Sequence, residues 1–215
     1  MSTLRVPGAT LHYKVRGSGP LLLLISGGSA DPDLFDGVGA LLGDRFTIAT
    51  YDPRGNSRSP LDGPLRDLYI EELADDAHLL LAELTDEPAY VFGSSSGALT
   101  ALELLVKHSD QARLIVAHEP PAFGLLPDAE EHYAFFESVH ATYLSEGADA
   151  AMRLFGKGIG EERPGRPPTH TPNDGPHRQD EYAQSAPREN LAHPPMVCAP
   201  TLTRSPIPQA GWVAA

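Results

Sequence analysis

The segment YVFGSSSGALTA, residues 90–101, determines how the fold of this chain is interpreted. It contains the pattern Gly-x-Ser-x-Gly, with an apolar run before it and a helix-forming run after it. A sharp turn that joins a strand directly to a helix needs small residues on both sides of its central residue, which is Ser95 here. The pattern predicts that Ser95 is a nucleophile raised above a sheet. The alternative is a glycine-rich turn that only caps the helix with Ser94 or Ser96.

Outward from this turn, apolar strands and amphipathic helices alternate along the chain. The first two strands are separated by Pro7-Gly8 and are expected to form a hairpin. The uniformly apolar stretch LLLLI is typical of a strand buried on both faces of a parallel sheet. Strands are predicted at residues 3–6, 9–16, 21–25, 46–51, 89–92 and 114–117, and helices at 33–42, 71–84 and 98–108. This alternation predicts the α/β class with a mostly parallel, doubly wound sheet.

The pattern changes beyond residue 120. Residues 127–146 and 148–155 have helical spacing, whereas the stretch from 161 onward is rich in proline and has no period. We therefore divide the chain into a core at 1–125, a helical cap at 126–160, and a disordered or non-native tail at 161–215. The cap aromatics Tyr133, Phe135 and Phe136, together with Ser29, are the candidate lining of a substrate pocket.

The loop after the first buried strand reads Ser26-Gly27-Gly28. An acyl-transfer site needs two N–H donors that point at the developing oxyanion. One normally belongs to the residue after the nucleophile, here Ser96, and the other to this loop, where Gly28 is the candidate. The alternative is a plain strand-to-helix loop whose glycines serve only the turn.

Four stretches together resemble the α/β-hydrolase superfamily, namely LLLLISGG (21–28), YDPRGNSRS (51–59), GSSSG (93–97) and AHEPP (117–121). The resemblance extends over about residues 1–155 and is closest to the group of small bacterial serine esterases, haloperoxidase-like hydrolases and proline-type aminopeptidases. It implies the α/β-hydrolase fold with a helical cap and no cofactor. Ser26 departs from the family, which usually has histidine there. The turn at Asp52 and Arg54 is interpreted as structural, through a local ion pair or a capped turn.

The resemblance also implies an acid and a histidine that follow the nucleophile in the chain. Glu119, after the strand that follows the elbow helix, is a candidate acid, although a plain loop charge explains it equally well. None of the histidines at 108, 118, 132, 140, 170, 177 and 193 has the expected context after an apolar strand. The last strands of the fold are not recognisable. We therefore expect a C-terminally truncated or frame-shifted chain whose catalytic histidine is not identified.

Composition restricts the partners. The net charge is −13, with 29 acidic and 16 basic residues, so binding to nucleic acid is not expected. No apolar run is long enough to span a membrane, no secretory signal is visible, and the single cysteine, Cys198, suits the cytoplasm. The histidines are not spaced as paired metal ligands, so no metal site is predicted.

Two functional hypotheses follow. The first is a serine hydrolase that acts on a small ester, lactone or amide by nucleophilic attack of Ser95. The second is a catalytically inactive protein that keeps part of this fold in a vestigial or binding role. The presence of an activating base distinguishes them.

Overall fold

The computed structural model of the chain describes residues 2–28, 35–64 and 66–160. These residues form two compact units, of which the first ends at Gly124 and the second begins at Leu125.

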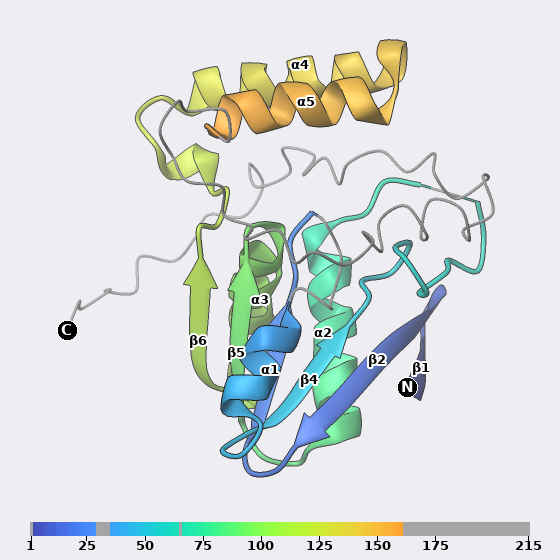
Figure 1. Cartoon of the computed structure of the whole chain (residues 1–215), viewed down its shortest axis with the longest axis vertical. Helices are drawn as coiled ribbons and strands as arrows, with labels where there is room; N and C mark the ends of the chain where they lie inside the picture. Colours follow the sequence, from blue (N-terminus) through green and yellow to red (C-terminus); the bar gives the residue numbers. More distant parts are fainter. Residues whose placement is uncertain (1, 29–34, 65, 161–215) are drawn as a thin grey trace, which may run out of the picture. The chain divides into compact units, whose positions relative to one another are not determined.

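The first unit is built on a six-stranded sheet with the order β1-β2-β4-β3-β5-β6 (Figure 1). The strands are β1 (Ser2–Val6), β2 (Ala9–Gly17), β3 (Leu21–Ile25), β4 (Thr47–Tyr51), β5 (Ala89–Ser94) and β6 (Ala112–His118). β1 and β2 form the predicted antiparallel hairpin, and β2 pairs antiparallel with β4. The remaining neighbours are parallel. The expected mostly parallel sheet is therefore confirmed.

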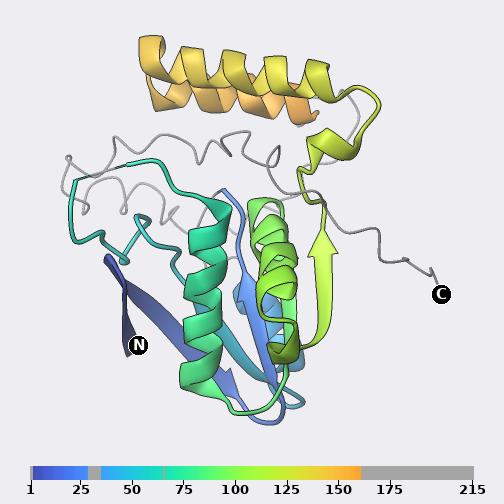
Figure 2. The ribbon, with the colours of Figure 1, turned by 180° about the vertical axis from the view of Figure 1, so that it is seen from behind.

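Helices cover both faces of this sheet. α1 (Asp36–Leu42) lies on one face, and α2 (Ile70–Leu84) and α3 (Ser96–Lys107) lie on the other (Figures 1 and 2). β3 lies between β4 and β5, so it has neighbours on both sides and helices on both faces, which explains its continuous apolar sequence. The doubly wound arrangement predicted from the sequence is present.

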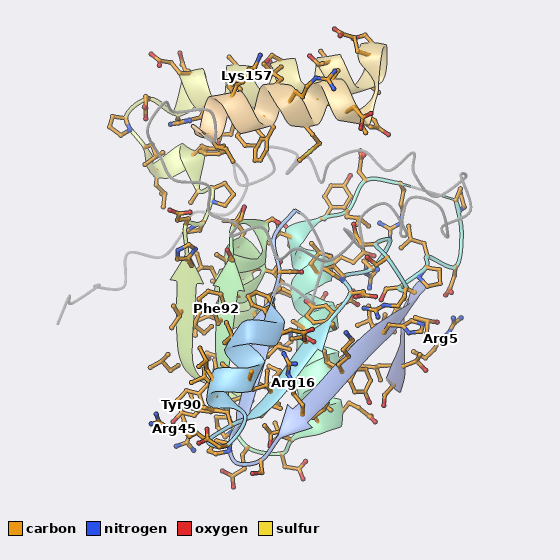
Figure 3. All side chains as sticks on the ribbon, viewed as in Figure 1. Arg5, Arg16, Arg45, Tyr90, Phe92 and Lys157 are labelled. Atoms are coloured by element: carbon orange, nitrogen blue, oxygen red, sulfur yellow. The ribbon has the colours of Figure 1, made fainter. Side chains whose placement is uncertain are left out.

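Two apolar clusters hold these layers together. The larger cluster lies under α2 and α3 and includes Leu23, Leu80 and Leu104, which are fully buried. The smaller one lies under α1. There Phe92 of β5 packs edge-on against Phe35, with 5.9 Å between the ring centroids. Phe92 is labelled with its strand neighbour Tyr90 in Figure 3. The sheet is therefore fixed from both sides beneath the β5–α3 turn.

The turn after β4 is fixed by buried ion pairs. Arg54, which is 2% exposed, donates to both carboxylate oxygens of Asp76 in α2, and it also pairs with Glu72. The buried carboxylate of Asp52 accepts from the backbone and the side chain of Arg58. These contacts agree with the structural interpretation of the turn.

The second unit contains a helical hairpin. α4 (Ala129–Glu146) and α5 (Ala148–Ile159) are joined at Gly147, whose φ of 90° suits glycine. Phe136 packs on Phe155 with 5.9 Å between ring centroids. The helices predicted at 127–146 and 148–155 are present with slightly different ends. The role of this hairpin as a cap stays a prediction. The tail predicted at 161–215 lies outside the described residues.

Candidate active site

Ser95 is the single residue between β5 and α3. Its backbone has φ 55° and ψ −123°, a conformation that residues other than glycine rarely adopt. Its carbonyl already accepts from the N–H of Ala98 at 2.9 Å, as the first helical bond of α3. Strand and helix thus meet at one strained serine, which is the geometry that the Gly-x-Ser-x-Gly pattern predicts. The role of Ser95 as a nucleophile stays a prediction.

Three glycines are needed for the close approach of backbone segments around this serine. A Cβ on Gly93 would lie 2.2 Å from the carbonyl oxygen of Gly97. A Cβ on Gly97 would lie 2.4 Å from the carbonyl oxygen of Ile25 and 2.5 Å from that of Ser26. A Cβ on Gly27 would lie 2.9 Å from the Cβ of Ser95. The loop after β3 therefore runs directly against the turn.

The two predicted oxyanion donors lie on the segments that meet there. Ser96 is the first residue of α3, where backbone N–H groups lack helical acceptors and the helix dipole is positive. Gly28 is exposed, and a Cβ on it would meet nothing within 4 Å. Sequence reasoning missed the contact of Gly27 with Ser95, although the paired glycines at 27 and 28 were the available signal. The donor roles of Gly28 and Ser96 stay predictions.

The acid candidate follows β6 directly. Glu119 has a φ of 49°, and no hydrogen bond or ion pair of its exposed carboxylate is found among the described residues. The residue before it, His118, accepts from the backbone N–H of Ser95 through its carbonyl oxygen at 2.9 Å. Glu119 therefore directly follows the residue whose carbonyl oxygen binds the backbone of the candidate nucleophile. Its role as the acid stays a prediction.

No imidazole is hydrogen-bonded to the Ser95 hydroxyl within the part of the chain that the structure describes. Nδ1 of His118 lies 3.5 Å from Oγ of the neighbouring Ser94. His108 lies at the far end of α3, where its ring stacks on His78 with 3.7 Å between centroids. His132 and His140 belong to α4 of the second unit. His170, His177 and His193 lie outside the described residues.

Three of the four predicted pocket residues belong to the second unit. Tyr133, Phe135 and Phe136 are half-buried residues of α4. The rings of Phe135 and Phe136 meet edge-on at 5.5 Å between centroids, within the helical hairpin. Ser29 lies outside the described residues. The pocket role of all four residues stays a prediction.

Metal-binding clusters and membrane-spanning helices are absent from residues 2–28, 35–64 and 66–160. No cluster of three or more His, Cys, Asp or Glu side chains there could hold a metal ion. None of the described helices combines the length and the apolar character that a membrane span requires.

Comparison with known families identifies the fold. The profile described as alpha/beta hydrolase fold matches residues 20–147, which is more than half of the chain. The chain belongs to the α/β-hydrolase family. The matched range includes the glycine loop after β3, the serine turn and Glu119.

Two curated relatives with similar sequences are named as hydrolases. The uncharacterized hydrolase YraK of Bacillus subtilis is 46% identical over 154 residues, which cover 71% of this chain and 57% of that protein. The zearalenone hydrolase of Bionectria ochroleuca is 33% identical over 124 residues, covering 56% of this chain and 47% of that protein. The chain thus spans about half the length of the curated relatives it matches.

Solved structures show the same fold. The enol-lactonase from Burkholderia xenovorans has a TM-score of 0.58 at 22% identity, covering 74% of this α/β-hydrolase chain and 58% of that structure. A thermophilic esterase from Thermogutta terrifontis also has a TM-score of 0.58, at 21% identity. The match covers 68% of this chain and 55% of that structure. At these identities the likeness extends to the fold alone.

Proposed function

We propose that this α/β-hydrolase chain carries the nucleophile of a serine hydrolase that acts on a small ester, lactone or amide. The observation that carries the proposal is the backbone of Ser95, held at φ 55° between a strand and a helix N-terminus. Strain of this kind persists only when the surrounding structure enforces it, and it concentrates at active sites. The names of the two curated relatives, both hydrolases, support the same reaction class.

The proposed reaction proceeds through an acyl-enzyme. Oγ of Ser95 attacks the carbonyl carbon while a base removes its proton, and the backbone N–H groups of Ser96 and Gly28 bind the oxyanion. Collapse of the tetrahedral intermediate releases the alcohol or amine, which takes up a proton. Water then releases the acid and regenerates the serine. Glu119 would orient the base and stabilise its protonated form.

Covalent labelling tests this proposal. A fluorophosphonate reacts with a serine hydroxyl only when a base activates it. We expect mass spectrometry to find the label on Ser95 of the intact chain, lost in Ser95→Ala and kept in Ser94→Ala. Labelling of single His→Ala variants at 118, 170, 177 and 193 then identifies the base. An intact chain that folds but takes up no label contradicts the proposal and favours the inactive alternative.

A further inference from the structure

Two buried hydroxyl groups beside Ser95 have no hydrogen-bond partner among the described residues. They are Oγ of Ser26, in a residue 3% exposed, and Oγ of Ser96, in a residue 8% exposed. A buried hydroxyl that makes no hydrogen bond raises the free energy of the folded state. Two neighbouring hydroxyls without hydrogen-bond partners therefore need a physical reason.

The two hydroxyl-bearing segments are in direct contact. Ser26 follows β3, and Ile25 at the end of that strand lies opposite Gly93 of β5. The backbone of Ser26 also packs on the first turn of α3, because a Cβ on Gly97 would lie 2.5 Å from the Ser26 carbonyl oxygen. Both serines thus flank the N-terminus of α3 at the residue that is the candidate nucleophile.

Two other buried hydroxyls of the first unit, those of Ser59 and Thr100, are hydrogen-bonded. Ser59 is fully buried, and its Oγ donates to the carbonyl oxygen of Asp52 at 2.7 Å and accepts from the N–H of His12 at 2.8 Å. Thr100 donates to the carbonyl oxygen of Ser96 at 3.2 Å. Ser96 itself lacks such an acceptor because the residue four positions before it belongs to β5. Among the described residues, the buried hydroxyls without a partner are therefore those of Ser26 and Ser96.

We propose that the hydroxyl groups of Ser26 and Ser96 bind the acyl oxygen of the ligand at the N-terminus of α3. This rests on the proposed function and adds two side-chain donors to the backbone N–H groups. The helix dipole favours a negatively charged or polarised oxygen at this position. A serine hydroxyl changes direction by rotation about χ1, which moves it between staggered rotamers. Binding then satisfies two hydroxyl groups that have no partner among the described residues.

The test uses butyrate, the carboxylate that a butyryl ester would release, because its binding does not require an active nucleophile. Its dissociation constant is measured by NMR titration of the full chain and of Ser26→Ala, Ser96→Ala, Ser59→Ala and Ser95→Ala. We expect Ser26→Ala and Ser96→Ala each to weaken binding roughly 2- to 10-fold. Ser59→Ala is the matched control for a buried serine outside the site and should bind butyrate like the unmodified chain.

Thermal melting of the free variants separates binding from a structural role. Removal of an unpaired hydroxyl should leave Tm unchanged or raise it, whereas Ser59→Ala breaks two hydrogen bonds and should lower it. The inference is overturned if the unmodified chain does not bind butyrate, or if Ser26→Ala and Ser96→Ala bind it equally well. It is also overturned if both lower Tm as Ser59→Ala does. Failure of the proposed function alone gives a different result. Butyrate would still bind to the intact chain and to Ser95→Ala, but the intact chain would take up no fluorophosphonate.

Discussion

The backbone N–H of Ser95 donates to the carbonyl oxygen of His118 across 2.9 Å, from the end of β5 to the end of β6. The residue after His118 is Glu119, and both Ser95 and Glu119 have positive φ angles, of 55° and 49°. The hydrogen bond from the candidate nucleophile therefore ends one residue before the candidate acid, and both of these residues have positive φ. Their relative placement is set by the sheet and not by a flexible loop.

The first prediction concerns Glu119. Glu119→Gln keeps the shape of the side chain but removes the charge that would stabilise a protonated base. We expect the rate of fluorophosphonate labelling of Ser95 to fall at least about tenfold, with Tm unchanged because the carboxylate is exposed. Glu131→Gln, an exposed residue of α4, is the control. Equal labelling of Glu119→Gln and the unmodified chain would remove Glu119 from the mechanism.

The second prediction concerns backbone strain at Ser95. Ser95→Gly and Ser95→Ala both lack the hydroxyl, but only glycine adopts φ 55° without a Cβ penalty. We expect Ser95→Gly to be more stable than Ser95→Ala by about 1 kcal/mol, measured by urea unfolding. At Ala98, inside α3, glycine should instead lower the free energy of unfolding by about 1 kcal/mol. If glycine and alanine had the same order of stability at positions 95 and 98, the backbone strain at Ser95 would be contradicted.

The third prediction concerns Gly97. Its Cβ position lies 2.4 Å from a backbone oxygen of β3, which cannot move without distorting the central strand. We expect Gly97→Ala to lower the free energy of unfolding by more than about 3 kcal/mol. Gly37 in α1 has nothing within 4 Å of its Cβ position, so Gly37→Ala should raise stability by roughly 0.5–1 kcal/mol. A mild effect at Gly97 would show that α3 approaches β3 less closely.

The strands and helices of the first unit were predictable because their signals are local. The apolar run of β3 predicted a central buried strand, and Pro7-Gly8 predicted the turn between β1 and β2. The glycine register around Ser95 predicted a strand-to-helix turn. The predicted ends differ by a few residues, since α3 begins at Ser96 and not at residue 98. The sharp turn leaves no linker between Ser95 and the helix.

Contacts between segments distant in sequence were not predictable. The glycine pair at 27 and 28 predicted a loop, but the approach of Gly27 to Ser95 depends on how β3 and β5 pair. The predicted local ion pair is present between Asp52 and Arg58, but it is wrong for Arg54. The partner of Arg54 is Asp76, which lies on α2 and reaches Arg54 only when that helix packs on the sheet.

The fourth prediction concerns this buried pair. Burial alone would lower the pKa of Arg54, but the hydrogen bonds and charges of Asp76 and Glu72 outweigh it and raise the pKa. Removal of one partner leaves a buried charge uncompensated, so Arg54→Met and Asp76→Leu should each cost about 3–5 kcal/mol of stability. The double variant should recover most of that loss, because no unpaired charge remains. Additive losses in urea unfolding would show that the two side chains do not interact.

The last prediction concerns acid stability through Glu72. The hydrogen bond from Arg66, with the charge of Arg54, lowers the pKa of Glu72 below its ordinary value of 4.5 although burial opposes this. A carboxyl whose pKa is lower in the folded state stabilises the fold above its unfolded pKa, and this contribution is lost as the pH falls through the folded pKa.

Glu72→Gln removes this contribution. We expect the difference in free energy of unfolding between the unmodified chain and Glu72→Gln, from urea unfolding, to be constant at neutral pH. It should shrink as the pH falls below about 4.5. Glu87→Gln, whose side chain is 82% exposed, should follow the unmodified chain throughout. A difference between Glu72→Gln and the unmodified chain that stays constant down to pH 3 would show that Arg66 and Arg54 do not stabilise the Glu72 carboxylate.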